Sequence, residues 1–298
     1  MRIAIAATPA IAIPALESLS RQHHIIFVVT QSDKAQGRGR QILPSEVAQW
    51  ASQRSIEVLK PERFIELEDR LVEVDLVITI AYGQIIPERV LNVPRYGFIN
   101  LHYSLLPQWR GAAPVQRALM AGDKKSGVTV FALDKGMDTG PIYVQKEVVI
   151  AREWRSKELF EELNRVGVIA LQECVEKIES GATPYVQVGE PSFAPKIEKS
   201  ENHLALEKPA STLFNEIRGL YPNAYFNFKE SRIKVTTAHE GSSSIGKCGE
   251  VIELQPLRIV CGENSSLIIT SVIPEGKREM SSEEWLRGAR LTIGEIFG

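Results

Sequence analysis

Short apolar runs alternate with segments of helical periodicity up to about residue 180, and this constrains the fold more than any other feature. Runs such as LVITI at residues 76–80 are apolar throughout and end in turn residues, which is typical of strands buried on both faces of a parallel sheet. The rhythm predicts a mostly parallel, Rossmann-like sheet covered by helices, with functional residues at the carboxyl ends of the strands. The expected strands are residues 2–7, 25–30, 57–59, 76–80, 97–102, 128–133 and 142–150, and the expected helices are residues 13–19, 45–54 and 158–178.

The pattern changes after residue 181, where Gly, Pro, Ser and isolated charges predominate, and this composition predicts a linker. Beyond it, a short helix and several short strands separated by Gly and Pro turns predict a small β-barrel. We therefore predict an α/β domain at residues 1–181, a linker at 182–204 and a barrel domain at 205–298. The second domain is expected to contain a helix at residues 210–220, strands at 224–229, 232–238, 249–254, 258–261 and 266–272, and a helical turn at 285–290.

Composition excludes several classes of protein. The chain has 298 residues, 44% hydrophobic and 24% charged, which is ordinary for a globular protein of two domains. The net charge of −2 excludes a basic protein that coats nucleic acid, although a local patch could still bind it. The 3 cysteines lie far apart, in neither a disulfide nor a zinc pattern, so we expect a cytoplasmic protein without a metal site. Every apolar stretch is shorter than the roughly 18 residues of a membrane span, so we expect no membrane contact.

The segment at residues 98–141 carries side chains suited to acyl transfer. Asn100 and His102 lie two positions apart at the end of an expected strand, so alternation places both on one face. Asp138 follows in GMDTGP, whose glycines let the backbone fold closely around a ligand. An amide, an imidazole and a carboxylate can together stabilise an oxyanion and move protons. Taken alone, the same residues also fit a structural role at a strand end followed by an ordinary turn.

The string NLHYSLLP at residues 100–107, followed by Asp138 in a glycine-rich loop, resembles the folate-dependent formyltransferase superfamily. Within it, the chain is similar to the methionyl-tRNA formyltransferase family nearly from end to end, through ATPAIAIPALESL, TQSDKAQGRGR, AYGQIIP, WRGAAPVQRAL and IRGLYPNAY. The resemblance implies formyl transfer from 10-formyltetrahydrofolate to the α-amine of methionyl initiator tRNA, for translation initiation. It also implies that residues 1–181 are catalytic and that residues 205–298 form an OB-like barrel that binds tRNA.

The resemblance assigns a role to each of the three catalytic candidates. Asn100 would donate to the formyl oxygen as it becomes an oxyanion, and His102 would stabilise the same charge. Asp138 would tune the imidazole and help to remove the proton of the attacking amine. The resemblance also implies a folate site at the 104–107 turn and after the 76–80 strand, although Tyr82 and Ile85 fit ordinary packing equally well. The implied folate residues are Ser104, Leu105, Leu106, Pro107, Ile80, Ala81, Tyr82 and Ile85.

The loop at residues 31–43 is long for a connection between a strand and a helix, and the resemblance implies that it contacts the tRNA. It carries Lys34, Arg38 and Arg40 beside glycines that would let it order on binding. In the related enzymes this loop enters the acceptor stem of the tRNA, and Arg38 matches its key arginine. Contacts from these side chains to phosphate would make binding fall with added salt. The alternative is an ordinary solvated loop.

Two positions depart from the family pattern. Ala7 stands where glycine is usual, and Tyr103 stands where a small residue is usual. Alternation points the Tyr103 side chain away from the face that carries Asn100 and His102, so we expect it to fill core space.

Three other functions stay open from the sequence. A sugar-nucleotide N-formyltransferase would keep the same catalytic residues but would not need the 31–43 loop. A folate-binding or RNA-binding module without catalysis would not need all three catalytic residues. A dinucleotide-dependent dehydrogenase fits the fold, but no GxGxxG follows the first strand. For the formyltransferase that the resemblance implies, we expect a monomer.

Overall fold

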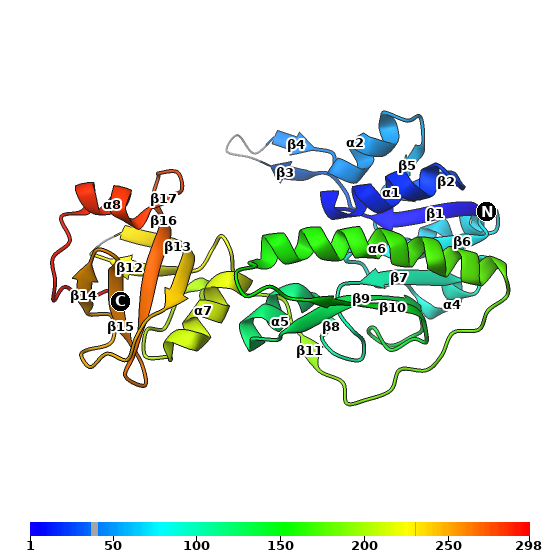
Figure 1. Cartoon of the computed structure of the whole chain (residues 1–298). Coiled ribbons are helices and arrows are strands. Elements are labelled where there is room, and N and C mark those ends of the chain that lie inside the picture. The colour runs from blue at the N-terminus through cyan, green and yellow to red at the C-terminus, as the bar shows by residue number, and fades with distance from the viewer. Residues whose placement is uncertain (37–40, 230) are drawn as a thin grey trace. The chain divides into compact units, whose positions relative to one another are not determined.

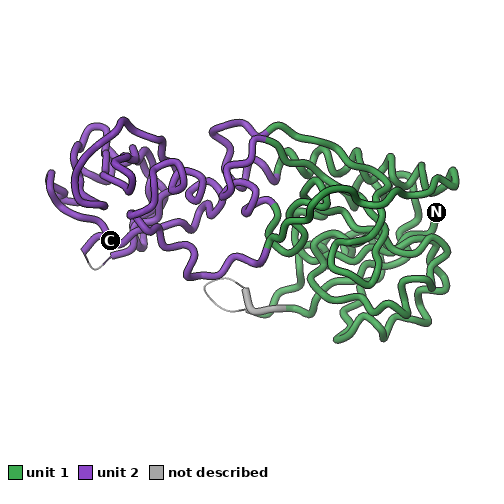
Figure 2. Tube along the Cα trace, turned by 90° about the horizontal axis from the view of Figure 1, so that it is seen from below, with its two compact units in different colours: residues 1–114, 125–149, 161–194 green, residues 115–124, 150–160, 195–298 purple. Residues whose placement is uncertain are grey.

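The computed structural model describes residues 1–36, 41–229 and 231–298. The chain divides into two compact units, which Figure 2 shows in different colours. The first unit comprises residues 1–114, 125–149 and 161–194, and the second comprises residues 115–124, 150–160 and 195–298. The division of the sequence into residues 1–181, 182–204 and 205–298 stays a prediction.

A seven-stranded sheet forms the centre of the first unit, in the order β10-β9-β7-β6-β1-β2-β5 (Figure 1). The five strands from β7 to β5 are parallel, whereas β9 runs antiparallel to both of its neighbours. From β1 the chain first builds β2 and β5 on one side and then β6 and β7 on the other. Strand order therefore reverses between β1 and β6, which is where open α/β sheets bind ligands. The strands are β1 (Arg2–Ala7), β2 (His24–Val29), β5 (Glu57–Leu59), β6 (Leu76–Ile80), β7 (Phe98–His102), β9 (Lys125–Ala132) and β10 (Ile142–Val149).

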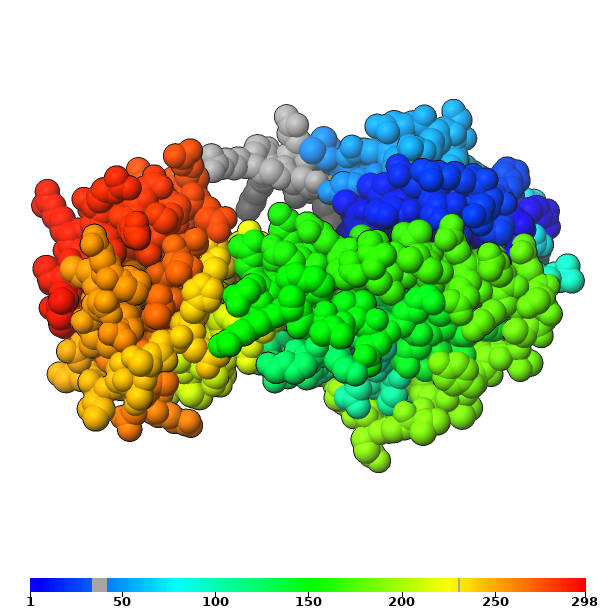
Figure 3. All heavy atoms as spheres, viewed as in Figure 1, coloured from blue at the N-terminus to red at the C-terminus, as the bar shows by residue number. Residues whose placement is uncertain are grey.

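Helices cover both faces of this sheet. Helices α1 and α6 lie over one face (Figures 1 and 3), where Gln172 Nε2 of α6 donates to Ser18 Oγ of α1 at 2.8 Å. Helix α6 packs closely on β7, because a Cβ at Gly167 would lie 3.0 Å from the Leu101 side chain. The opposite face packs in a buried cluster with α3, α4 and the short helix η2. The helical elements here are η1 (Ala10–Ala12), α1 (Ile13–Ser20), α2 (Glu46–Ser52), η2 (Phe64–Leu67), α3 (Glu68–Leu71), α4 (Glu88–Leu91) and α6 (Ser156–Glu179).

An antiparallel sheet forms the second unit, in the order β12-β13-β16-β15-β14 with β17 paired to β16. It curls as an open half-barrel (Figure 1), and register shifts beside Thr237 in β13 bend the sheet. Its core includes the stacked rings of Phe226 and Phe297, whose centroids are 4.3 Å apart. The elements are α5 (Pro114–Ala121), η3 (Lys199–Asn202), α7 (Ala210–Gly219), β12 (Tyr225–Phe228), β13 (Ser231–Glu240), β14 (Val251–Leu254), β15 (Leu257–Cys261), β16 (Ser265–Pro274), β17 (Met280–Ser281) and α8 (Ser282–Ala289).

The predicted fold class is confirmed: a Rossmann-like, mostly parallel sheet domain is followed by a small curled β domain. The sequence did not predict four very short strands. Two of them form a hairpin in the loop expected to contact tRNA, and the other two pair in parallel. They are β3 (Lys34–Gln36), β4 (Gln41–Leu43), β8 (Arg110–Gly111) and β11 (Phe193–Ala194). Across the described residues, no helix combines the length and apolar character needed to span a bilayer.

Candidate active site

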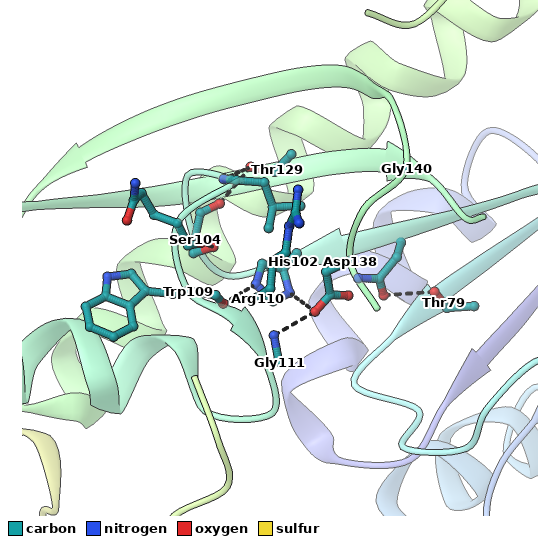
Figure 4. A network of polar contacts seen from close by, with 12 residues as sticks. Thr79, His102, Ser104, Trp109, Arg110, Gly111, Thr129, Asp138 and Gly140 are labelled. Carbon is teal, nitrogen blue, oxygen red and sulfur yellow. Dashed lines mark hydrogen bonds and ion pairs between the residues drawn. The ribbon is translucent and has the colours of Figure 1, made fainter. Parts of the chain in front are cut away.

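A pocket of about 610 Å³ opens at the carboxyl ends of β6 and β7, beside the reversal in strand order. Its walls are the loop after β6, the end of β7 and the loop between β9 and β10. Asn100, His102 and Asp138 all line it, so the fold brings together the three residues predicted as catalytic. Figure 4 shows two of them, His102 and Asp138, side by side. A concave site with a few convergent polar groups on mostly apolar walls is the usual form of a small-molecule site.

The Asn100 side chain is oriented by the neighbouring strand. Thr79 of β6 is its register partner, and Thr79 Oγ1 donates to Asn100 Oδ1 at 2.8 Å. The same hydroxyl lies 3.1 Å from the carbonyl oxygen of Ile99. Because the amide oxygen is held by Thr79, the Nδ2 group is the end of the amide that can donate to an oxygen in the pocket. Sequence reasoning missed Thr79, although a single threonine in the apolar run LVITI was a signal for it.

His102 is buried at the end of β7, between a carbonyl and a carboxylate. Its Nε2 lies 2.9 Å from the carbonyl oxygen of Trp109, and its Nδ1 lies 3.8 Å from Asp138 Oδ2. Because a carbonyl only accepts, Nε2 carries the proton and Nδ1 faces the carboxylate. Burial lowers the pKa of His102 below its usual value, while the negative charge of Asp138 acts in the opposite direction. The imidazole is therefore neutral near pH 7, and a proton arriving at Nδ1 would lie beside the Asp138 carboxylate.

Asp138 is held by a loop that folds tightly on itself. Its Oδ2 accepts a hydrogen bond from the Gly111 backbone N–H at 2.7 Å, and its backbone has a φ of 55°. Asp134 Oδ1 accepts from Gly136 N at 2.9 Å and from Thr139 Oγ1 at 2.6 Å, which closes the loop. Sequence reasoning also missed the Gly111 contact, because the donor is a backbone group that no residue type reveals.

The loop after β6 supplies part of the pocket wall. Ala81, Tyr82 and Ile85 line the pocket, whereas Ile80 is buried in the strand. Tyr82 packs edge-on against Phe64 with ring centroids 5.7 Å apart, and burial raises the pKa of its hydroxyl to about 12. Ile85 is 92% exposed at the pocket. An apolar side chain so placed can cover a flat apolar ligand, but the assignment of these residues to folate stays a prediction.

The turn at residues 104–107 lies outside the pocket lining, and its polar groups bond within the protein. Ser104 Oγ donates to the Gln108 carbonyl oxygen at 2.5 Å. Thr129 Oγ1 donates to the Ser104 carbonyl oxygen at 2.7 Å and accepts from Leu106 N at 3.1 Å. These bonds fix the path of the chain toward Trp109, whose carbonyl meets His102. The predicted folate contacts of Ser104, Leu105, Leu106 and Pro107 stay predictions.

The remaining predicted residues have different outcomes. Arg38 and Arg40 lie outside the described residues, and Lys34 opens β3, where its backbone pairs with Leu43 of β4. Tyr103 is buried, and its hydroxyl donates to Asn164 Oδ1 of α6 at 2.8 Å, as expected for a residue that fills core space. Ala7 is buried at the end of β1. No group of three His, Cys, Asp or Glu side chains is placed to bind a metal ion within residues 1–36, 41–229 and 231–298.

Comparison with known proteins finds formyltransferases that are similar to both parts of the chain. Residues 1–175 match the Formyl transferase family, and residues 196–290 match the Formyl transferase, C-terminal domain family. The chain is 38% identical to a methionyl-tRNA formyltransferase of Thermus thermophilus, and the alignment covers 100% of this chain and 99% of that protein. It is also 38% identical to the methionyl-tRNA formyltransferase of Thermodesulfovibrio yellowstonii, over 96% of each chain.

The fold is similar to that of solved structures as well. An N-formyltransferase from Helicobacter canadensis, in complex with folinic acid and dTDP-3-aminofucose, superposes with a TM-score of 0.70 at 19% sequence identity. The superposition covers 90% of this chain and 98% of that chain. At this level of identity the likeness supports the fold and leaves the acceptor undecided.

Proposed function

Because the chain belongs to the methionyl-tRNA formyltransferase family, we propose that its pocket moves a formyl group from 10-formyltetrahydrofolate to methionyl initiator tRNA. The activity is that of a transferase of protein biosynthesis, which formylates the α-amine of the methionyl group for translation initiation. The observation that carries this conclusion is identity of 38% over 100% of the chain, together with three catalytic side chains that line one pocket. The donor, the residue roles and the cytoplasmic location, where translation takes place, are our proposals.

The proposed reaction forms one C–N bond and breaks another. The α-amine of the methionyl group attacks the formyl carbon, and the carbonyl oxygen becomes an oxyanion. Asn100 Nδ2 donates to that oxyanion, which it can do because Thr79 holds the other end of the amide. Loss of a single donor of this kind costs about 10²–10³ in rate in other enzymes. The bond from the formyl carbon to N10 of the folate then breaks.

His102 and Asp138 handle the proton released by the amine. Asp138 Oδ2 and His102 Nδ1 lie 3.8 Å apart, so a proton placed between them is shared by a carboxylate and a neutral imidazole. The pair takes the proton from the amine as the C–N bond forms, the protonated His102 stabilises the charge of the oxyanion, and the proton returns to N10 as the folate leaves. A neutral His102 suits this role because it can accept a proton near pH 7, and its charged form is then stabilised by Asp138 and by the Trp109 carbonyl.

The rest of the tRNA would be bound outside this pocket. We propose that residues 1–181 form the catalytic part, that residues 205–298 form a tRNA-binding barrel, and that Lys34, Arg38 and Arg40 contact the acceptor end. The separate match of residues 196–290 to the C-terminal family supports a distinct second domain. The basic residues at 34–40 suit a phosphate backbone.

One assay tests the proposed function against its main alternative. The protein is incubated with 10-formyltetrahydrofolate and one of three acceptors: methionyl initiator tRNA, elongator methionyl-tRNA or a dTDP-amino sugar. We expect N-formylmethionyl-tRNA with the initiator tRNA and much slower reaction with the other two acceptors. Formylation of the amino sugar without formylation of the tRNA would instead establish a sugar-nucleotide N-formyltransferase.

A further inference from the structure

The segment that follows α6 contains one residue with an unusual environment. Residues 182–194 carry no helix and only the two-residue strand β11, and most of their side chains face solvent. Val186 is 74% exposed and Val188 is 82% exposed, but Gln187 between them is half-buried. Apolar side chains are ordinarily buried and polar ones exposed, and here the polar side chain is turned inward while its two apolar neighbours face solvent. Its environment therefore calls for an explanation in terms of polar contacts.

The Gln187 amide forms hydrogen bonds at both ends. Its Nε2 donates to the carbonyl oxygens of Asp138 and Gly140, each at 2.9 Å. Its Oε1 accepts from Nη2 of Arg110 at 2.6 Å. Arg110 lies between Trp109 and Gly111, so one side chain connects the Asp138 loop with the segment that contacts both catalytic groups. Figure 4 shows Arg110 and Asp138 beside His102, with Gly140 farther along the Asp138 loop.

Each of the two segments that Gln187 connects contains a residue with an unfavourable backbone conformation. Asp138 has a φ of 55° and Trp109 has a φ of 59°, in the left-handed region that is unfavourable for residues other than glycine. Gln187 binds the backbone carbonyl of Asp138, and the carboxylate of the same residue faces His102. The Trp109 carbonyl beside Arg110 is the partner of His102 Nε2. Fixing these two backbone segments relative to each other therefore fixes the two groups that flank the imidazole.

We propose that Gln187 is a positioning residue for formyl transfer, which holds the Asp138 carboxylate against His102 by fixing the Asp138–Gly140 backbone to Arg110. This proposal rests on the catalytic role proposed above for Asp138. Gln187 contacts no reacting atom and acts through the backbone of the loop.

Substitution of Gln187 leaves its segment attached to the first unit by other bonds. Tyr185 and Ile142 exchange backbone hydrogen bonds at 2.9 and 2.7 Å on one side of it. Strand β11 pairs in parallel with β8 on the other side. Removal of the amide therefore loosens the Asp138 loop without detaching the segment.

The first test compares Gln187→Ala and Gln187→Met with wild type. Methionine keeps the length of the side chain but has no amide, so it separates hydrogen bonding from packing. We expect kcat to fall by about ten- to a hundredfold in both variants, because all three hydrogen bonds of the amide are lost, with the KM for each substrate within about twofold of wild type. The matched control is Gln172→Ala, which removes the bond to Ser18 between α6 and α1 and should leave kcat unchanged. Normal kcat in Gln187→Met would show that the side chain only fills space.

The second test does not depend on turnover. Asp138 is the charged group that faces His102, while Phe131 of β9 and the Trp109 carbonyl are its uncharged neighbours. In an NMR titration of the imidazole, we expect the His102 midpoint to fall in Gln187→Ala, because the carboxylate that raises it is no longer held close. Asp138→Asn gives the limiting shift, and Gln172→Ala should give none. An unchanged midpoint in Gln187→Ala would overturn the proposal.

The two tests separate this proposal from the proposed function. If wild type formylates methionyl-tRNA but the Gln187 variants keep both kcat and the His102 midpoint, the positioning role is wrong and the function stands. If wild type does not formylate methionyl-tRNA, the proposed function fails, and the titration alone decides whether Gln187 holds Asp138 against His102.

Discussion

The hydrogen bond from Thr79 to Asn100 allows a quantitative prediction. Thr79 is 4% exposed, and valine has nearly its shape, so Thr79→Val removes the hydroxyl without opening a cavity. The bond measures 2.8 Å, and an ordinary hydrogen bond contributes about 0.5–1.5 kcal/mol. If the whole contribution is lost in the transition state, kcat falls by about two- to twelvefold. Asn100→Ala, which removes the oxyanion donor itself, should cost about 10²–10³.

A double-mutant cycle checks that Thr79 acts through Asn100. Single-turnover formylation rates are measured for Thr79→Val, Asn100→Ala and the double variant. The double variant should be no slower than Asn100→Ala, because the amide that Thr79 orients is then absent. The same two- to twelvefold loss in the Asn100→Ala background would refute the reasoning.

A matched control is available in the second unit. Thr236 is fully buried, and its Oγ1 has no hydrogen-bond partner among the residues that the structure describes. Thr236→Val makes the same chemical change and should leave the formylation rate unchanged. Thr79→Ser, which keeps the hydroxyl, should retain most of the rate.

Three further predictions can be tested independently. Arg38→Ala should weaken use of methionyl-tRNA by about ten- to a hundredfold with little change in folate affinity, and Arg38→Lys should recover part of the loss; steady-state kinetics at several salt concentrations check this. The pKa of His102 is lower in the folded protein than in the unfolded chain, so folding favours the neutral imidazole. The free energy of unfolding therefore has its full value above the unfolded pKa near 6.5 and decreases as pH falls from there through the folded pKa. Thermal unfolding against pH should therefore show a decline on acidification that is smaller in His102→Gln. Gly288→Ala should stabilise α8 by about 0.5–1 kcal/mol, since its added Cβ would lie in open space, whereas Gly140→Ala should be strongly destabilising because its Cβ would lie 1.8 Å from the Ala132 carbonyl oxygen.

The strands that were predicted correctly in the first unit have a clear local residue pattern. The run LVITI and the alternation around Asn100 and His102 identify β6 and β7, because burial of a strand depends on its own residues. The three catalytic candidates could be proposed because their residue types occur in an ordered motif within one stretch of chain. Strands β8 and β11 could not be predicted, because two residues are too few to show any alternation.

The contacts that orient the catalytic groups could not be predicted from local residue patterns. Thr79 reaches Asn100 because β6 and β7 are neighbours, and strand order is not encoded in any local pattern. Gln187 reaches the Asp138 loop from a segment whose composition predicts a linker. Each of these contacts joins residues far apart in the chain, so it emerges only when the sheet is assembled.

Unfavourable backbone conformations also gather at the pocket. Ala81, Trp109 and Asp138 all have φ values between 47° and 59°, and each lies in a loop beside a catalytic group. Left-handed residues other than glycine cost about 1–2 kcal/mol each, and they persist where surrounding contacts hold them. Asp138 is held by the hydrogen bonds of Gly111 N with its carboxylate and of Gln187 with its carbonyl, and Trp109 is held by the bond from its N–H to Ser192 Oγ. The ends of β6 and β7 hold the amide and the imidazole, and the loop contacts hold the carboxylate, so the three groups are in place before any substrate binds.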